Sequence, residues 1–216
     1  MKKHVYALIL LIVLLSGCSN QTQQQTVLTV SAASSLSDVL QNVAAQFQAE
    51  HPTISIQFNF GASGSLKEQI EQGAPVDLFL SASSEKYEEL VNEQLIDHSV
   101  NLASNEIVLI TSVKSTVNLH EFSDLVHDDI EKIAIGTPTV VPAGTYGKQA
   151  LHDYDVWTII ENKIVYAKDV RQVLTYVETN NTQAGIVYKT DALASKKVRI
   201  VKTAEKNSYD AISYPA

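Results

Sequence analysis

The sequence predicts an α/β protein in two lobes with a cleft between them, and three observations lead to this prediction. Apolar segments of strand length alternate with helical segments along the 216-residue chain, which is typical of βαβ units and parallel sheets. The alternation is interrupted by the polar residues 101–105 and then begins again. Small residues and serines stand where strands pass into helices. The repeated alternation indicates a second lobe, and the serine-rich turns indicate where a site could form.

The stretch 27–47 begins with an apolar strand, passes through the small residues 31–35 and continues as a periodic helix. Apolar side chains recur on one face of this helix at Leu36, Val39, Leu40, Val43, Ala44 and Phe47. The first amides of a helix lack internal partners and lie at the positive end of its dipole, so this turn suits an anion. The alternative is that Ser34 or Ser35 simply caps the helix.

A second unit of the same kind follows. An alternating strand at 54–60 leads into the turn 61–65, Gly-Ala-Ser-Gly-Ser, and then into a helix at 66–72. Two strand–turn–helix units with small hydroxyl residues indicate one site assembled from two helix starts. A buried strand at 76–80 comes next, and Ser83 and Ser84 introduce another helix.

The second set of elements supplies two further helix starts. We expect strands at 107–110, 133–135, 164–166 and 184–188, and helices near 123–126, after Pro142, at 157–160 and after Asp169. Proline is tolerated at a helix start because its missing N–H is not needed there. Asp169 is a good N-cap and leaves Val170 as the first helical residue with a free amide. Ordinary capping and turn chemistry is the alternative interpretation of both starts.

The N-terminal residues have the features of a targeting segment. Residues 1–17 have two lysines, an apolar run and small residues before Cys18, a pattern that resembles the lipobox of bacterial lipoproteins. A plain secretory signal that happens to contain a cysteine is the alternative. We therefore predict a lipoprotein signal at 1–17, a lipidated tether at 18–26 that begins with Cys18, and an extracytoplasmic protein anchored to the cell membrane.

Several chemistries have little support in the sequence. A net charge of −8 without a Lys/Arg run argues against nucleic acid as a partner. Residues 61–65 nearly match the nucleophile elbow of serine hydrolases, but Ser65 stands where a glycine is needed. The mature histidines lie in no triad context: His51, His98, His120, His127 and His152. No nucleotide-binding motif occurs, and the carboxylates are too scattered for a metal cation site.

Five segments carry a family resemblance: AASSLSDVLQNVAAQF, FNFGASGSLKEQIEQGAPVDLFLSA, VPAGTYGKQAL, DVRQVLTYVE and AGIVYKTDA. They resemble the extracytoplasmic molybdate-binding proteins of ABC importers. The resemblance implies a two-lobed periplasmic-binding-protein-like fold of the class II type, with a parallel or mixed sheet flanked by helices in each lobe. It implies lobe 1 at 27–104, lobe 2 at 105–204 and a return crossing toward lobe 1 at 205–216. Because family members continue further, we expect the sequence to be shortened at Ala216.

The same resemblance implies a set of ligands for a tetrahedral oxyanion. Carried over by position, these are the hydroxyls of Ser35, Ser63 and Tyr188 and the amides of Ala143 and Val170. Every one of them is a donor, which favours a fully ionised anion over hydrogen phosphate. We expect a monomeric, non-enzymatic protein that binds molybdate or tungstate, uses no cofactor and delivers its ligand to a membrane permease. Sulfate is the alternative ligand, and a secreted serine hydrolase is the alternative from another class.

Overall fold

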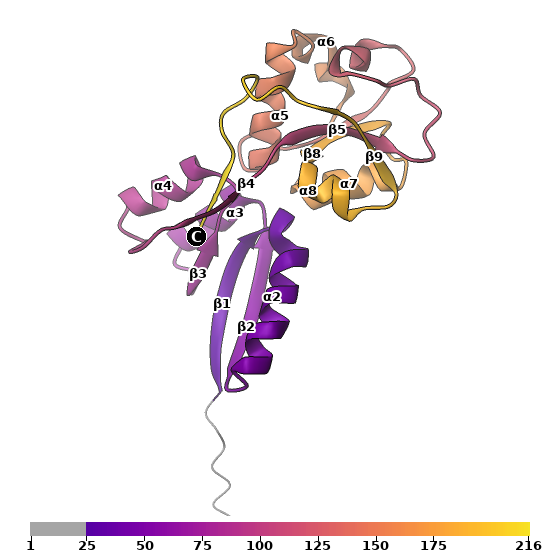
Figure 1. The fold of residues 1–216 in the computed structure, drawn as a ribbon. Coiled ribbons are helices and arrows are strands. Elements are labelled where there is room, and N and C mark those ends of the chain that lie inside the picture. The colour runs from indigo at the N-terminus through magenta and orange to yellow at the C-terminus, as the bar shows by residue number, and fades with distance from the viewer. Residues whose placement is uncertain (1–24) are drawn as a thin grey trace, which may run out of the picture.

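The structure is a computed structural model that describes residues 25–216. Cys18, the predicted signal 1–17 and most of the predicted tether lie outside the described residues. The predicted α/β fold with two lobes is confirmed, and Figure 1 shows one lobe above the other. Within residues 25–216, no helix has both the length and the apolar character needed to cross a bilayer.

Lobe 1 is built on a parallel three-stranded sheet with the order β2-β1-β3. Its elements are β1 (Thr26–Ala33), the 3-10 turn η1 (Ser34–Leu36), α2 (Ser37–Glu50), β2 (Ile54–Gly61), α3 (Ser63–Glu71), β3 (Leu78–Leu80) and α4 (Ser84–Asn92). Ala33 of β1 is in register with Gly61 of β2. Because parallel strands end at the same edge of a sheet, the turns after these two residues lie side by side.

Lobe 2 is built on a mixed five-stranded sheet with the order β7-β6-β8-β5-β9. Its strands are β5 (Ile107–Ser112), β6 (Ile133–Gly136), β7 (Ile164–Ala167), β8 (Ala184–Tyr188) and β9 (Val198–Thr203). Its helices are η2 (Phe122–Val126), α5 (Pro142–Asp153), α6 (Trp157–Ile160), η3 (Glu161–Lys163), α7 (Val170–Glu178) and α8 (Lys189–Ala194). Strands β6, β7 and β8 are parallel, whereas β5 runs antiparallel to both of its neighbours.

Helices α5 and α7 cover opposite faces of this sheet. On β8, a Cβ added at Gly185 would meet Val173 and Val177 of α7, while Ile186 packs against Gly147 of α5. Successive residues of a strand point to opposite faces, so the two helices enclose β8 between them. The strands β5, β6 and β8 are buried along their whole length, which explains their continuous apolar sequences.

A two-stranded ribbon joins the lobes. Strands β4 (Asn101–Ser104) and β10 (Ser213–Pro215) pair antiparallel, and the chain continues from β4 into β5. Figure 1 shows the ribbon beside lobe 1, with the yellow C-terminal segment descending to it from lobe 2. From the sequence, residues 101–105 were expected to be a polar link only, and β10 was not predicted.

Two local features differ from the sequence-based expectations. Strand β1 continues to Ala33, because residues 31–33 pair with β2 and do not form a turn. The apolar face of α2 is not fully covered in the described part of the chain, since Val39 and Val43 are 52% and 53% exposed.

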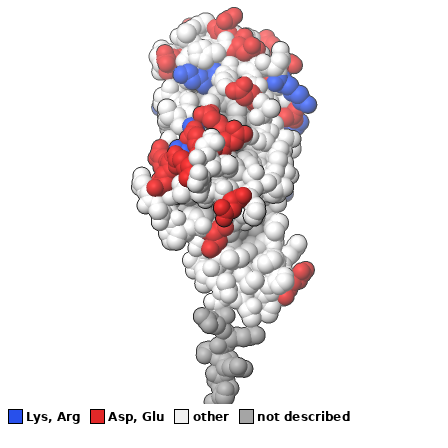
Figure 2. Space-filling view, turned by 90° about the vertical axis from the view of Figure 1, so that its left-hand side faces the viewer, with Lys and Arg blue, Asp and Glu red and all other residues white. Residues whose placement is uncertain are grey.

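Figure 2 shows acidic side chains gathered on the face that carries α4, where Glu85 and Glu89 pair with Lys86.

Candidate functional site

A small cavity between the lobes brings together all five residues predicted as ligands. Its volume is about 10 Å³. Its lining comes from the ends of both sheets and the starts of the helices that follow: Ala33, Ser34, Ser35, Gly61, Ala62, Ser63, Ala82, Val141, Pro142, Ala143, Val170 and Tyr188. No charged side chain and no histidine is among these lining residues, so the polar groups that the cavity presents are all neutral.

The hydroxyl of Ser35 does not cap a helix. The N-cap positions of η1 and α2 are Ala33 and Leu36, and neither start has a side-chain cap. The Ser35 hydroxyl lies instead 3.2 Å from the hydroxyl of Tyr214, 179 positions away along the chain. The capping interpretation of Ser34 and Ser35 is therefore wrong, because tertiary contacts use this hydroxyl.

Ser63 has a comparable arrangement in the second turn. It is the first residue of α3, follows the N-cap Ala62 and makes no capping bond. Its Oγ accepts a hydrogen bond of 2.9 Å from the amide of Ala82, and the residue is 1% exposed. Because this amide engages one lone pair of Ser63 and leaves the hydroxyl proton unused, that proton is free to be donated into the cavity.

The amides of Ala143 and Val170 come from the two helix starts of lobe 2. Pro142 is the first residue of α5, as predicted, and Asp169 caps α7 by accepting from the amide of Gln172. Ala143 and Val170 therefore lie in first helical turns, where amides have no internal acceptor. Both helix dipoles add positive potential at the cavity without a formal charge.

A glycine contact determines where α5 begins. A Cβ at Gly144 would lie 2.0 Å from the carbonyl oxygen of Gly136, at the end of β6. Only a residue without a side chain allows α5 to start this close to the end of the strand. The close approach places the Ala143 amide at the edge of the sheet where the cavity forms.

Tyr188, at the end of β8, reaches across to lobe 1. Its hydroxyl donates to the carbonyl oxygen of Ala82 at 3.2 Å, and the residue is 1% exposed. Burial raises the pKa of the Tyr188 phenol well above its ordinary value. The phenol therefore keeps its proton at neutral pH and can donate it to an anion once the hydroxyl turns away from the Ala82 carbonyl oxygen.

The lobes touch one another around the cavity. The amide of Gly64 in lobe 1 donates to the carbonyl oxygen of Val140 in lobe 2 at 3.0 Å. A volume of about 10 Å³ has room for about one water-sized sphere. An oxyanion with four oxygens is larger, so its entry requires the lobes to separate.

A charged cluster lies next to the Val170 amide. Arg171 of α7 pairs with Asp38 of α2 at 3.0 Å, across the interlobe boundary, and approaches Asp191 of α8 at 3.5 Å. The Asp191 side chain is fully buried, and its Oδ2 has no hydrogen-bond partner among residues 25–216. Burial raises the pKa of Asp191 from 3.8 to about 7, although the Arg171 charge acts in the opposite direction.

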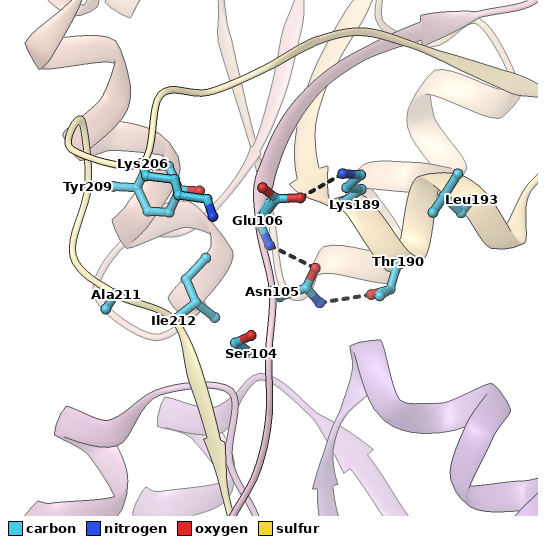
Figure 3. Close-up of a pocket in the computed structure, with 10 residues that line it drawn as sticks. All are labelled: Ser104, Asn105, Glu106, Lys189, Thr190, Leu193, Lys206, Tyr209, Ala211 and Ile212. Atoms are coloured by element: carbon cyan, nitrogen blue, oxygen red, sulfur yellow. Dashed lines mark hydrogen bonds and ion pairs between the residues drawn. The ribbon is translucent and has the colours of Figure 1, made fainter.

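A larger pocket of about 500 Å³ lies where the two crossing segments meet α8. Figure 3 shows Glu106 paired with Lys189, and Asn105 bonded both to the Glu106 amide and to Thr190. These contacts attach the first crossing segment to the helix that follows Tyr188. The pocket is separate from the small cavity, and none of its lining residues was predicted as a ligand.

The sequence did not predict the residues that hydrogen-bond to the site serines or that join the lobes beside the cavity. Gly64 and Ala82 stand inside one of the five family-like segments, but nothing local to them or to Tyr214 predicts their contacts, which join distant segments. Arg171 stands inside one of the five family-like segments, which was the only available signal for it.

Comparison with known proteins also indicates a binding protein. The family described as bacterial extracellular solute-binding protein matches residues 28–216. The chain belongs to this family. A cavity at the lobe boundary with a few placed polar groups in a mainly apolar lining suits the binding of a small solute.

Among relatives of the chain is a Bacillus subtilis protein, YvgL, named as an ABC transporter substrate-binding lipoprotein. It is 46% identical over 209 residues, which cover 94% of this chain and 80% of YvgL. The molybdate-binding protein ModA of Haemophilus influenzae is 34% identical over 94% of this chain and 82% of its own length. The structure of the periplasmic molybdate-binding protein of Azotobacter vinelandii superposes with a TM-score of 0.75 at 24% identity, covering 87% of this chain and 83% of that one.

Proposed function

We propose that this solute-binding protein takes up molybdate, and also tungstate, outside the cell and delivers it to the membrane permease of an ABC importer. The observation that carries the proposal is the set of five donors at one uncharged cavity: the hydroxyls of Ser35, Ser63 and Tyr188 and the amides of Ala143 and Val170. The molybdate-binding relatives support the same ligand class.

The chemistry of the ligand fits a site made only of donors. Molybdate is a dianion with no proton to donate, so it needs donors and gains nothing from a carboxylate acceptor. Five charge-assisted hydrogen bonds of roughly 1.5–3 kcal/mol each give on the order of 8–15 kcal/mol. Association costs at least about 4 kcal/mol, which leaves up to about 11 kcal/mol and is compatible with micromolar or tighter affinity.

Release and delivery require the lobes to move. Donors from both lobes surround the cavity, so binding favours the arrangement in which the lobes are together. A permease that recognises both lobes would then distinguish the loaded protein from the empty one. Sulfate has the same charge and shape as molybdate, so discrimination between them depends on the size of the loaded cavity.

Isothermal titration tests this proposal. The mature chain with Cys18→Ala, which prevents lipid attachment, is titrated with molybdate, tungstate, sulfate and phosphate. We expect submicromolar binding of molybdate and tungstate and much weaker binding of sulfate. A folded protein that binds none of these anions would contradict the proposal.

The double variant Ser35→Ala with Ser63→Ala tests the ligand set. It removes two hydroxyl donors and should abolish measurable molybdate binding, because each charge-assisted bond contributes roughly 1.5–3 kcal/mol. Circular dichroism should show an intact fold. Unchanged affinity in the double variant would show that the site lies elsewhere.

A further inference from the structure

A hydrogen-bond chain connects the site serine Ser35 to the ribbon between the lobes. The Ser35 hydroxyl lies 3.2 Å from the hydroxyl of Tyr214 in β10, and the Tyr214 hydroxyl lies 2.9 Å from Nδ2 of Asn105, which directly follows β4. A hydroxyl both donates and accepts, so the two hydroxyls do not fix which of them is the donor. Asn105, at the other end of the chain of hydrogen bonds, fixes it.

The amide group of Asn105 has a fixed orientation. The backbone N–H of Glu106 can only donate, and it lies 2.9 Å from Oδ1 of Asn105. The oxygen therefore faces Glu106, and the NH₂ group faces the hydroxyl of Thr190 at 2.8 Å, as Figure 3 shows, and the hydroxyl of Tyr214.

The orientation of Asn105 determines the role of Tyr214. An NH₂ group can only donate, so the Tyr214 oxygen accepts from Asn105, and its single proton is available for Ser35. Tyr214 is 2% exposed, and burial raises the pKa of its phenol, so this proton is retained at neutral pH. Within the described residues Ser35 is the one acceptor in reach of this buried proton, so the arrangement in which Tyr214 donates to Ser35 uses it and leaves the Ser35 proton free to point into the cavity.

We propose that Asn105 and Tyr214 form a one-way hydrogen-bond relay that holds the Ser35 hydroxyl as a donor toward the bound anion and so selects oxyanions that carry no proton. The Ala82 amide has the same effect on Ser63, because it occupies the oxygen of that serine from behind. Hydrogen phosphate would bring a proton toward two hydroxyls that already accept one hydrogen bond each and have their own protons turned to donate, so it gains less from them than a fully ionised anion. This inference rests on the proposed oxyanion function and makes Tyr214 and Asn105 positioning residues for it.

The test compares Tyr214→Phe with the wild-type chain. The phenylalanine ring keeps the packing against Tyr188, whose ring centroid lies 5.8 Å away, and removes only the hydroxyl. Without this donor the Ser35 hydroxyl can turn either way. We expect molybdate affinity to fall about five- to tenfold.

Selectivity is the readout that a purely structural role would not change. At about pH 8, sulfate and monohydrogen phosphate have the same charge and similar size but differ by one proton, and both are measured as competitors of molybdate. We expect Tyr214→Phe to reduce the preference for sulfate over phosphate by about fivefold or more. Asn105→Asp reverses the relay, because a carboxylate accepts the Tyr214 proton, and should weaken molybdate binding further.

Tyr209→Phe is the matched control. Tyr209 lies on the same crossing segment, and its hydroxyl accepts from the Ile107 amide without contacting Ser35. It should leave the preference between the two anions unchanged. An unchanged preference in Tyr214→Phe, or the same change in Tyr209→Phe, would overturn the relay.

A second measurement separates the relay from the proposed function. The side-chain amide resonances of Asn105, followed by NMR without any anion, should shift in Tyr214→Phe and stay in place in Tyr209→Phe. Absence of that shift would refute the relay. If the wild-type chain binds no oxyanion but Tyr214→Phe still shifts these resonances, the proposed function is refuted and the hydrogen bond from Asn105 to Tyr214 is established.

Discussion

Serine at a helix start commonly satisfies the helix itself, but Ser35 and Ser63 do not. The oxygen of Ser63 is occupied by the amide of Ala82, and that of Ser35 lies against the hydroxyl of Tyr214. Both hydroxyls are therefore supported by segments outside their own helices. A site made in this way can offer protons to an anion without any lysine or arginine in its lining.

Asp191 gives a pH-dependent prediction at the same scale. Its pKa in the folded protein is about 7, compared with an ordinary value of 3.8, because it is buried. Arg171 faces it with one positive charge, and Asp38 and Asp169 add negative charge nearby. The folded state therefore binds the proton more tightly than the unfolded state, so this contribution to stability is complete below about pH 4 and is lost as the pH rises through 7.

The variant Asp191→Asn should remove this dependence, since asparagine stays neutral at every pH. Between about pH 4 and pH 8 the wild-type free energy of unfolding should fall by roughly 4 kcal/mol more than that of the variant. Urea denaturation across this range measures the difference. Asp153→Asn, at an exposed position, controls for the loss of a carboxylate. Parallel pH profiles for wild type and Asp191→Asn would contradict the prediction.

Individual residues were predictable from the sequence where the local chain defines their role. The N-cap Asp169 and the first helical residue Pro142 are recognisable from their neighbours alone, and the structure confirms both. Tyr214 was not predictable, because its contact with Ser35 spans 179 positions. Whether the five residues at the cavity bind the anion stays a prediction.

At the scale of elements, helix α3 brings its backbone directly against lobe 2. The second residue of α3 is Gly64, and a Cβ there would lie 2.7 Å from the carbonyl oxygen of Val140. That distance is too short for a carbon and an oxygen, so any side chain at this position pushes the lobes apart. The glycine is therefore required by the approach of the lobes and not by the helix.

We predict that Gly64→Ala has opposite effects on binding and on stability. Overpacking of about 1–3 kcal/mol should weaken molybdate binding by about five- to hundredfold. The free energy of unfolding should rise by up to about 1 kcal/mol, because alanine favours helix and the separated lobes accommodate it. Titration calorimetry and urea denaturation measure the two effects. Glu68→Ala, on an exposed position of α3, should raise stability alone, and equal affinity in both variants would refute the prediction.

Elements with strong periodicity were predictable, and short ones that depend on partners were not. The strands β5, β6 and β8 are continuous apolar runs that become buried strands. Strand β4 is exposed along all four of its residues and exists because β10 pairs with it. A polar segment whose only strand signal is a distant partner cannot be recognised from its own sequence.

At the scale of the whole molecule, the proposed membrane location concerns a segment outside the described residues. We propose that Cys18 carries the lipid, as its position after an apolar run indicates. Cys18→Ala should then release the protein into the medium, because no acyl chain holds it. Fractionation of cells with an antibody against the chain measures this. Ser19→Ala is the control, and retention of Cys18→Ala in the membrane fraction would refute the anchor.

The ribbon of β4 and β10 limits how the lobes can move. Two hydrogen-bonded crossings allow bending about one axis and resist twisting, so the lobes have few relative degrees of freedom. Each time they come together, the two serines of lobe 1 meet the same two amides and tyrosine of lobe 2. Much of the entropy that separate groups would lose in gathering around a ligand is therefore lost when the chain folds, and closure of the lobes has only to join two prearranged half-sites.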